Sequence, residues 1–103
     1  MNLRELLNDA AAGLEEATIA AGPAGQATWS RGGTPFAVLH ADGLAAEFKL
    51  DAAVAAAAVR TPDVTASPRG PGWVLFRQVD LDPHGADRAL AWFASAYRRA
   101  TSG

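Results

Sequence analysis

The dipeptide Asp42-Gly43 is the feature that most constrains how this chain can fold, because it lies between two runs of strand-forming residues. Asp-Gly supplies the positive φ angles that a two-residue type I′ hairpin needs. A turn of two residues there pairs Leu39 with Ala46 and Ala37 with Phe48. This register gives the hairpin two faces. We expect Leu39, Leu44, Phe48 and Leu50 on the core face, and Phe36, Val38, His40, Glu47 and Lys49 on the opposite face.

Three segments carry helix signals. The first has apolar residues at steps of three and four, with an Asn2/Glu5 capping pair before it and Gly22-Pro23 after it, which predicts a helix over 3–21. A short helix over 52–60 is expected to end before Pro62, because the residue preceding a proline avoids helical angles. The last segment opens with an aspartate followed by proline at the first helical position, which predicts a helix over 83–100.

Strand patterns occupy most of the remaining chain. Alternating or β-branched and aromatic runs predict strands over 26–31, 35–41, 44–50, 64–67 and 73–79. A chain of 103 residues is the size of one domain with one core. The order of elements predicts a single α+β domain over 1–103, in which an antiparallel sheet of four to five strands packs against an N-terminal helix, a short middle helix and a C-terminal helix.

Composition excludes several classes of protein. The chain has no cysteine, which removes disulfides, thiolate metal sites and thiol nucleophiles and fits a reducing cytoplasm. The first residues mix charges into the place where an export signal needs an apolar run, and no later run reaches the roughly 18 apolar residues of a membrane span. We therefore expect a cytoplasmic protein with no membrane partner. A formal net charge of -2 argues against a surface that binds duplex nucleic acid.

Three stretches together resemble a known family. They are "LHADGLAAEFKL" (39–50), "TPDVTASPRGPGWVLF" (61–76) and "ADRALAWFASAYRRA" (86–100). Their succession of a histidine-containing hairpin, a Gly-Trp-Val strand and an alanine-rich closing helix resembles the small bacterial domain labelled luciferase-like. It also resembles, more distantly, the MmcQ/YjbR-like domains. The first resemblance implies no light-emitting chemistry, and the second implies a DNA-binding role.

Candidate chemistry is sparse. His40 and Glu47 share the predicted non-core face, where they form either an acid/base pair or a solvated histidine beside a carboxylate. His84 and Asp87 are three residues apart at a helix start, but two ligands do not make a metal site. The sequence contains none of the serine elbow, Walker A or dinucleotide-binding motifs. We expect no cofactor and no metal.

Arginines and tryptophans provide the candidate ligand-binding residues. Guanidinium groups bind phosphate and carboxylate in forked geometry, so Arg31, Arg60, Arg69 and Arg77 form a binding rim if the strand ends and loops bring them together. Dispersed surface arginines are the alternative. Trp73 lies close enough to Arg69 in sequence to stack on a shared ligand, although a core position is the alternative for it too.

Three hypotheses for function follow. The first is a non-catalytic binding or protein-interaction module, which includes a homodimer, with Phe36 and Val38 as an apolar interface on the non-core face. The second is a nucleic-acid-binding protein of MmcQ/YjbR type. The third is a small enzyme that uses His40 and Glu47.

Overall fold

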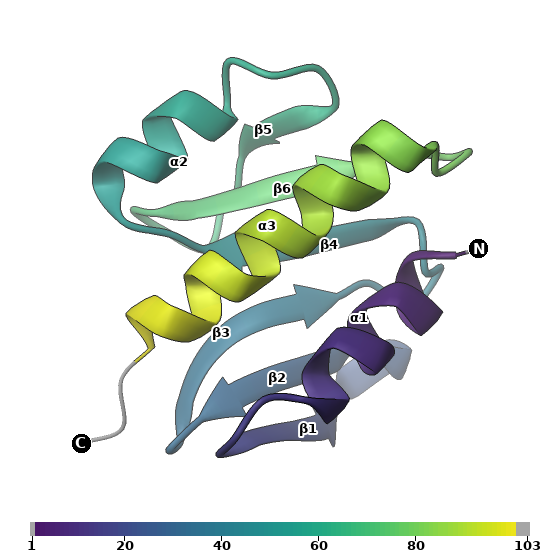
Figure 1. Cartoon of the computed structure of the whole chain (residues 1–103), viewed down its shortest axis with the longest axis vertical. Coiled ribbons are helices and arrows are strands. Elements are labelled where there is room, and N and C mark those ends of the chain that lie inside the picture. The colour runs from purple at the N-terminus through teal and green to yellow at the C-terminus, as the bar shows by residue number, and fades with distance from the viewer. Residues whose placement is uncertain (1, 101–103) are drawn as a thin grey trace.

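A six-stranded antiparallel sheet organises residues 2–100, which are the residues that the computed structural model describes (Figure 1). The strand order is β1-β2-β3-β4-β6-β5. The elements are α1 (Leu3–Ala12), β1 (Ala17–Ala21), a 3-10 turn (Pro23–Gly25), β2 (Ala27–Arg31), β3 (Thr34–Leu39), β4 (Ala45–Lys49), α2 (Ala52–Ala58), β5 (Val64–Ala66), β6 (Trp73–Arg77) and α3 (Pro83–Arg99). The α+β class is as expected, and the sheet has more strands than the four to five predicted.

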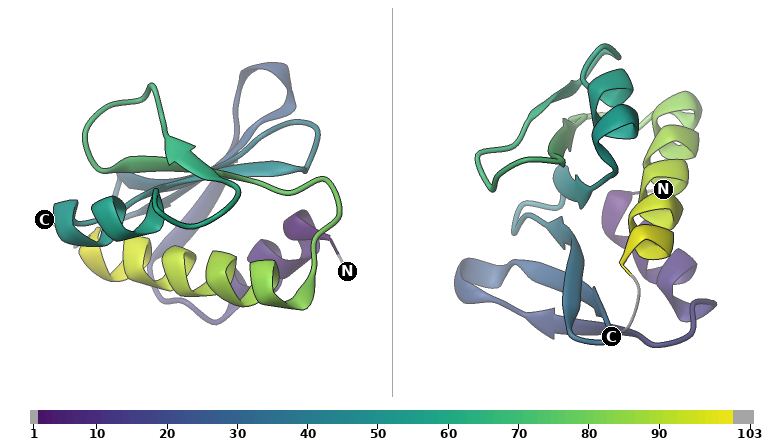
Figure 2. Two further views of the ribbon diagram at one scale, coloured as in Figure 1. Left: turned by 90° about the horizontal axis from the view of Figure 1, so that it is seen from above. Right: turned by 90° about the vertical axis from the view of Figure 1, so that its left-hand side faces the viewer.

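The helices of the described chain lie on one side of the sheet, as Figure 2 shows. Phe93 of α3 lies at the centre of the core and packs against Trp29 of β2, Phe36 of β3 and Phe48 of β4, with ring centroids 5.4, 5.4 and 6.4 Å from its own. Aromatic pairs at these separations add to the free energy gained from burying their area. We refer to the side of the sheet away from α1 and α3 as the open face.

The predicted helix over 3–21 is wrong in its second half. Helix α1 ends at Ala12, and Gly13 is its C-cap. Residues 17–21 form the edge strand β1, in which Ile19 lies opposite Trp29. The mistake has a physical cause, because alanine fits a helical stripe as well as a strand, whereas the adjacent Thr18 and Ile19 are β-branched and favour a strand.

The β3–β4 hairpin has the predicted register but a different turn. Ala37 pairs with Phe48 and Leu39 with Ala46, as expected. The His40 N–H donates to the Ala45 carbonyl oxygen at 2.9 Å, so the loop extends over 41–44. Only Gly43 in this loop has a positive φ, which rules out a type I′ turn. Because the predicted and observed loops both have an even length and the same centre, the register is unchanged.

A β-bulge in β3 overturns the predicted position of Phe36. Trp29 pairs with Ala37 and Ser30 with Pro35, so Phe36 has no partner in β2. The extra residue turns the Phe36 ring toward α3, where it is 0% exposed. Val38 remains on the open face but is only 2% exposed. The predicted exposed apolar interface at Phe36 and Val38 is therefore not present.

The other predicted elements agree with the structure to within two residues at each boundary. No helix in residues 2–100 combines the length and the apolar character needed to cross a membrane.

Candidate functional site

Glu47 lies at the centre of the open face, in a position where a carboxylate is unexpected. The alternation of β4 sends Ala46 and Phe48 into the core and Glu47 to the opposite side. Its side chain is nevertheless only 6% exposed. A buried charge is costly unless it is paired and hydrogen-bonded, so the neighbours of Glu47 determine whether it stabilises the fold.

Three side chains satisfy the Glu47 carboxylate. His40 Nε2 lies 2.8 Å and Arg69 Nε 3.0 Å from its Oε2 atom. Ser67 donates its hydroxyl hydrogen to Oε1. Burial alone would raise the pKa of Glu47, but the hydrogen bonds from Ser67, His40 and Arg69 and the positive charge of Arg69 outweigh it and lower the pKa below its ordinary value. Glu47 is therefore ionised at neutral pH.

The loop between β5 and β6 brings Arg69 to this carboxylate. The Arg69 backbone N–H donates to Ser67 Oγ at 3.1 Å, and the Trp73 N–H donates to the Gly70 carbonyl oxygen at 3.2 Å, so the turn is closed at both ends. Gly72 has a φ of 82°, and a Cβ there would lie 2.7 Å from the Leu50 carbonyl oxygen. The loop thus requires glycine where it crosses the end of β4.

Arg69 and Trp73 are in contact on the open face. The Arg69 guanidinium carbon lies 5.7 Å from the centroid of the Trp73 ring, within the range of a cation–π interaction. The Arg69 side chain is 36% exposed and Trp73 is half-buried. Lys49, which is directly opposite Trp73 in the sheet, donates from Nζ to the Pro71 carbonyl oxygen. We call His40, Glu47, Ser67, Arg69 and Trp73 the Glu47 cluster.

An ion pair joins the β3–β4 turn to the end of β6. Asp42 Oδ2 and Arg77 NH1 are 3.1 Å apart, and both side chains are about half exposed. The hydrogen bond from the Leu44 N–H and the nearby Arg77 together lower the pKa of Asp42 below its ordinary value. Arg77 and Arg69 thus each pair with a carboxylate, Arg77 with Asp42 at the turn and Arg69 with Glu47 in the cluster.

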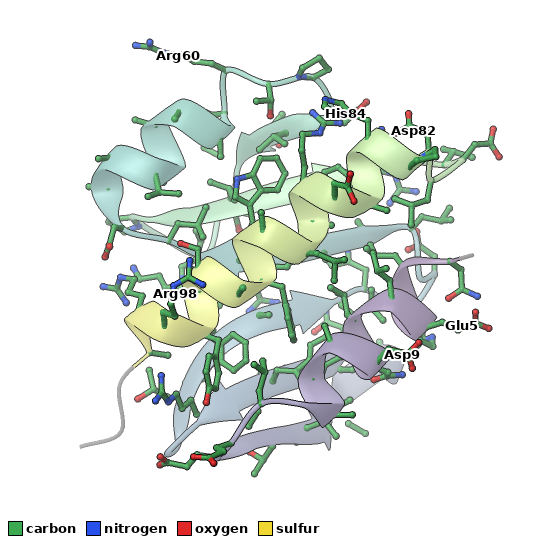
Figure 3. All side chains as sticks on the ribbon, in the orientation of Figure 1. Glu5, Asp9, Arg60, Asp82, His84 and Arg98 are labelled. Atoms are coloured by element: carbon green, nitrogen blue, oxygen red, sulfur yellow. The ribbon has the colours of Figure 1, made fainter. Side chains whose placement is uncertain are left out.

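The predicted arginine rim does not form. Arg31 faces the helices, where it donates from NH1 to the Tyr97 carbonyl oxygen at 3.0 Å and its guanidinium carbon lies 4.2 Å from the Tyr97 ring centroid. Arg60 is exposed after α2, and Figure 3 shows it projecting away from the rest of the chain. Arg77 pairs with Asp42, so of the four arginines proposed from sequence only Arg69 belongs to the Glu47 cluster.

His40 and Glu47 are in contact at 2.8 Å, whereas an acid/base role for them stays a prediction. Ser67, the other side chain that bonds Glu47 through its hydroxyl, is not among the site residues predicted from the sequence. The sequence places Ser67 at the end of a predicted strand and indicates no chemical role for it. The two prolines and two glycines that follow it predict a turn. They do not predict which side chains this turn places against Glu47. In residues 2–100 no group of three histidine, aspartate or glutamate side chains is arranged to hold a metal ion, and His84 is exposed at the start of α3.

Comparisons with known proteins identify a fold but no family. No family model and no curated protein matches the chain. A protein from Pseudomonas syringae with a crystal structure is similar in fold, with a TM-score of 0.70 and 11% sequence identity over 98% of this chain and 100% of that one. Identity at this level shows the fold alone. The resemblance to luciferase-like and MmcQ/YjbR-like domains stays a prediction.

Proposed function

We propose that the protein is a non-catalytic binding module that holds a planar anionic group, such as an aromatic carboxylate, at the Glu47 cluster. The observation that carries this proposal is the way Arg69 is held. Its Nε lies 3.0 Å from Glu47 Oε2 and its guanidinium carbon lies 5.7 Å from the Trp73 ring centroid, while 36% of the side chain is exposed and within reach of a ligand.

This arrangement suits an anion for two reasons. The two terminal nitrogens of a guanidinium form a fork that matches a carboxylate or phosphate in bidentate geometry. A side chain that is already fixed before binding also loses less conformational entropy when the ligand arrives. The Glu47 charge does not repel such a ligand strongly, because Arg69, together with the hydrogen bonds from His40 and Ser67, offsets it within the cluster.

Trp73 adds selectivity for planar ligands. Its half-buried ring lies beside Arg69 and provides an aromatic surface for offset stacking. Benzoate is therefore expected to bind more tightly than acetate, and the difference between the two measures the contribution of the ring.

Thermal unfolding in the presence of benzoate, acetate or inorganic phosphate tests the proposal. A ligand that binds only the folded state raises the melting temperature. At a free ligand concentration of about 100 times Kd, binding stabilises the folded state by about 2.7 kcal/mol. We expect benzoate to raise the melting temperature of the wild type and of Arg60→Gln, an exposed arginine outside the cluster, but not of Arg69→Gln. An equal rise in Arg69→Gln, or no rise with any anion, contradicts the proposal.

A second candidate function, acid/base catalysis by His40, rests on the 2.8 Å contact between His40 Nε2 and Glu47 Oε2. An ionised carboxylate accepts a hydrogen bond, so it holds the tautomer that carries its proton on Nε2 and leaves Nδ1 as the proton acceptor. The His40 side chain is 31% exposed, so that a substrate can reach it.

Hydrolysis of 4-nitrophenyl acetate reports such a base. The wild type and His84→Asn, which changes an exposed histidine on α3, are expected to accelerate hydrolysis equally, whereas His40→Asn loses the acceleration. Equal rates in all three proteins remove His40 as a catalytic base.

A further inference from the structure

The two edges of the sheet differ in how well they are protected. The β5 edge is short, covering only Val64–Ala66, and has Pro62 before it and Pro68 after it. The β1 edge, Ala17–Ala21, contains no proline and no charged residue, and its pairing with β2 is regular throughout. Charges, prolines and bulges are the usual means by which an edge strand avoids pairing with another chain. Strand β1 carries none of them.

A cleft runs beside β1 on the helix side of the sheet. Its volume is about 220 Å³, and it is lined by Asn8, Ala11 and Ala12 of α1, Ala17, Thr18 and Ile19 of β1, and Trp29 of β2. Ile19 is 54% exposed although it is a large aliphatic residue. The small alanines of α1 leave room next to it. A strand that paired with the β1 edge would direct alternate side chains toward this cleft.

The charge of the surrounding segment indicates what kind of chain fits there. Residues 1–21 contain one arginine and four carboxylates, Glu5, Asp9, Glu15 and Glu16, which is a net charge of -3. The rest of the chain has eight basic and seven acidic residues, a net charge of +1. The acidic excess therefore belongs to α1 and the turn that leads into β1, and Figure 3 shows Glu5 and Asp9 along α1.

This charge distribution favours a basic partner over a second copy of the chain. Two copies joined at their β1 edges would bring two acidic segments to the same interface, which repel each other. A segment with lysine or arginine on either side of its apolar residues would instead be attracted to the carboxylates of α1 and of the α1–β1 turn.

We propose that the β1 edge binds an extended, basic segment of another protein by strand addition. The segment pairs its backbone with β1, places an apolar side chain in the cleft next to Ile19, and sets its flanking lysine or arginine residues against the carboxylates of residues 5–16. This site is separate from the Glu47 cluster, which lies in the middle of the sheet on its open face.

Fluorescence anisotropy with a labelled peptide tests the proposal. The probe is an extended peptide of alternating valine and threonine with lysines at both ends, and a second peptide carries glutamates in place of the lysines. We expect the lysine peptide to bind and its affinity to fall as salt is added, because the charge attraction is exposed. The glutamate peptide is expected to bind at least about tenfold more weakly, because like charges repel.

A pair of matched variants shows whether the lysine peptide binds at the β1 edge. Ile19→Lys is expected to weaken the lysine peptide by about tenfold or more, because it removes apolar contact area and adds a like charge. Val79→Lys changes another exposed aliphatic residue, which is 69% exposed on the chain between β6 and α3, and is expected to leave binding unchanged. The double variant Glu15→Gln/Glu16→Asn is expected to weaken binding and to reduce its salt dependence; asparagine suits the positive φ of Glu16.

Three results would overturn the proposal: no binding of the lysine peptide at low salt, equal binding of the two peptides, or equal effects of Ile19→Lys and Val79→Lys. Sedimentation velocity supplies a further test. A wild-type dimer that Ile19→Lys converts to monomer would show that a second copy, and not a basic partner, occupies the β1 edge.

Discussion

Replacing Glu47 with glutamine is the most informative change to the fold, because it removes one charge and almost no volume. In the folded protein the carboxylate accepts from His40 at 2.8 Å and from Arg69 at 3.0 Å through one oxygen, and from Ser67 through the other. Glutamine keeps one acceptor oxygen, and the Ser67 hydroxyl can rotate to accept from the new amide. The hydrogen bonds can therefore survive Glu47→Gln, but they lose their charge.

The size of the effect follows from these contacts. Hydrogen bonds to charged groups contribute about 1.5–3 kcal/mol each and neutral ones about 1 kcal/mol. His40 and Arg69 are 31% and 36% exposed, so solvent screens part of this difference. Glutamine also avoids the free-energy cost of burying a charged carboxylate, which offsets another part of the loss. We expect Glu47→Gln to lower the free energy of unfolding by about 2 kcal/mol, which corresponds to a fall of about 10 °C in melting temperature.

Urea unfolding followed by tryptophan fluorescence measures this difference, with Asp9→Asn as the control at an exposed carboxylate. The pH dependence has a definite sign. The pKa of Glu47 is lowered in the folded state from its ordinary 4.5, so its stabilisation is present above pH 4.5 and is lost as the pH falls through the folded value. The gap between wild type and Glu47→Gln should therefore close in acid. Coincident unfolding curves at pH 7, or a gap that widens in acid, would show that the Glu47 charge does not stabilise the fold.

Three further predictions concern the fold and the turns around the site. Phe36→Ala should lower the free energy of unfolding by about 3–5 kcal/mol in urea, because the bulge buries the ring; an unchanged value would mean that the ring faces solvent. Gly72→Ala should cost about 1–3 kcal/mol, since φ is 82° and a Cβ would lie 2.7 Å from a backbone carbonyl oxygen; wild-type stability would contradict this. The Leu44 N–H and Arg77 both lower the pKa of Asp42, so Arg77→Gln should raise that pKa in a carboxyl NMR titration, and no change would remove Arg77 as a cause.

The sequence predicts those parts of the fold that depend on neighbouring residues. Alternation around Asp42-Gly43 predicts the β3–β4 register, because any even loop with the same centre gives the same pairs. The pattern of apolar residues is ambiguous where most of them are alanine, and it predicts a helix over the residues that form strand β1. It fails again at Phe36, because a bulge depends on how β3 meets β2 and on the space beneath α3, and neither is encoded within the strand itself.

The candidate site shows the same limit. His40 and Glu47 share a face because they belong to one hairpin, and this is predictable from the sequence. Arg69 and Trp73 are neighbours in one turn, which is also predictable. The connection between the two pairs depends on the pairing of β4 with β6 and on the bond from Ser67 to Glu47, contacts that link residues 20 to 32 positions apart. Arg31 does not join the site, because its side chain lies on the helix side of the sheet and donates to the Tyr97 carbonyl oxygen.

An NMR titration with benzoate shows whether an anion binds at the Glu47 cluster. The spectra follow the side-chain Nε–H of Arg69 and the indole N–H of Trp73, and the indoles of Trp29 and Trp92 serve as internal references. We expect saturable shifts of the Arg69 and Trp73 signals, small changes at the other two indoles, and loss of the Trp73 shift in Arg69→Gln. Signals of Arg69 and Trp73 that stay fixed while others move, or that move equally in Arg69→Gln, would contradict this expectation.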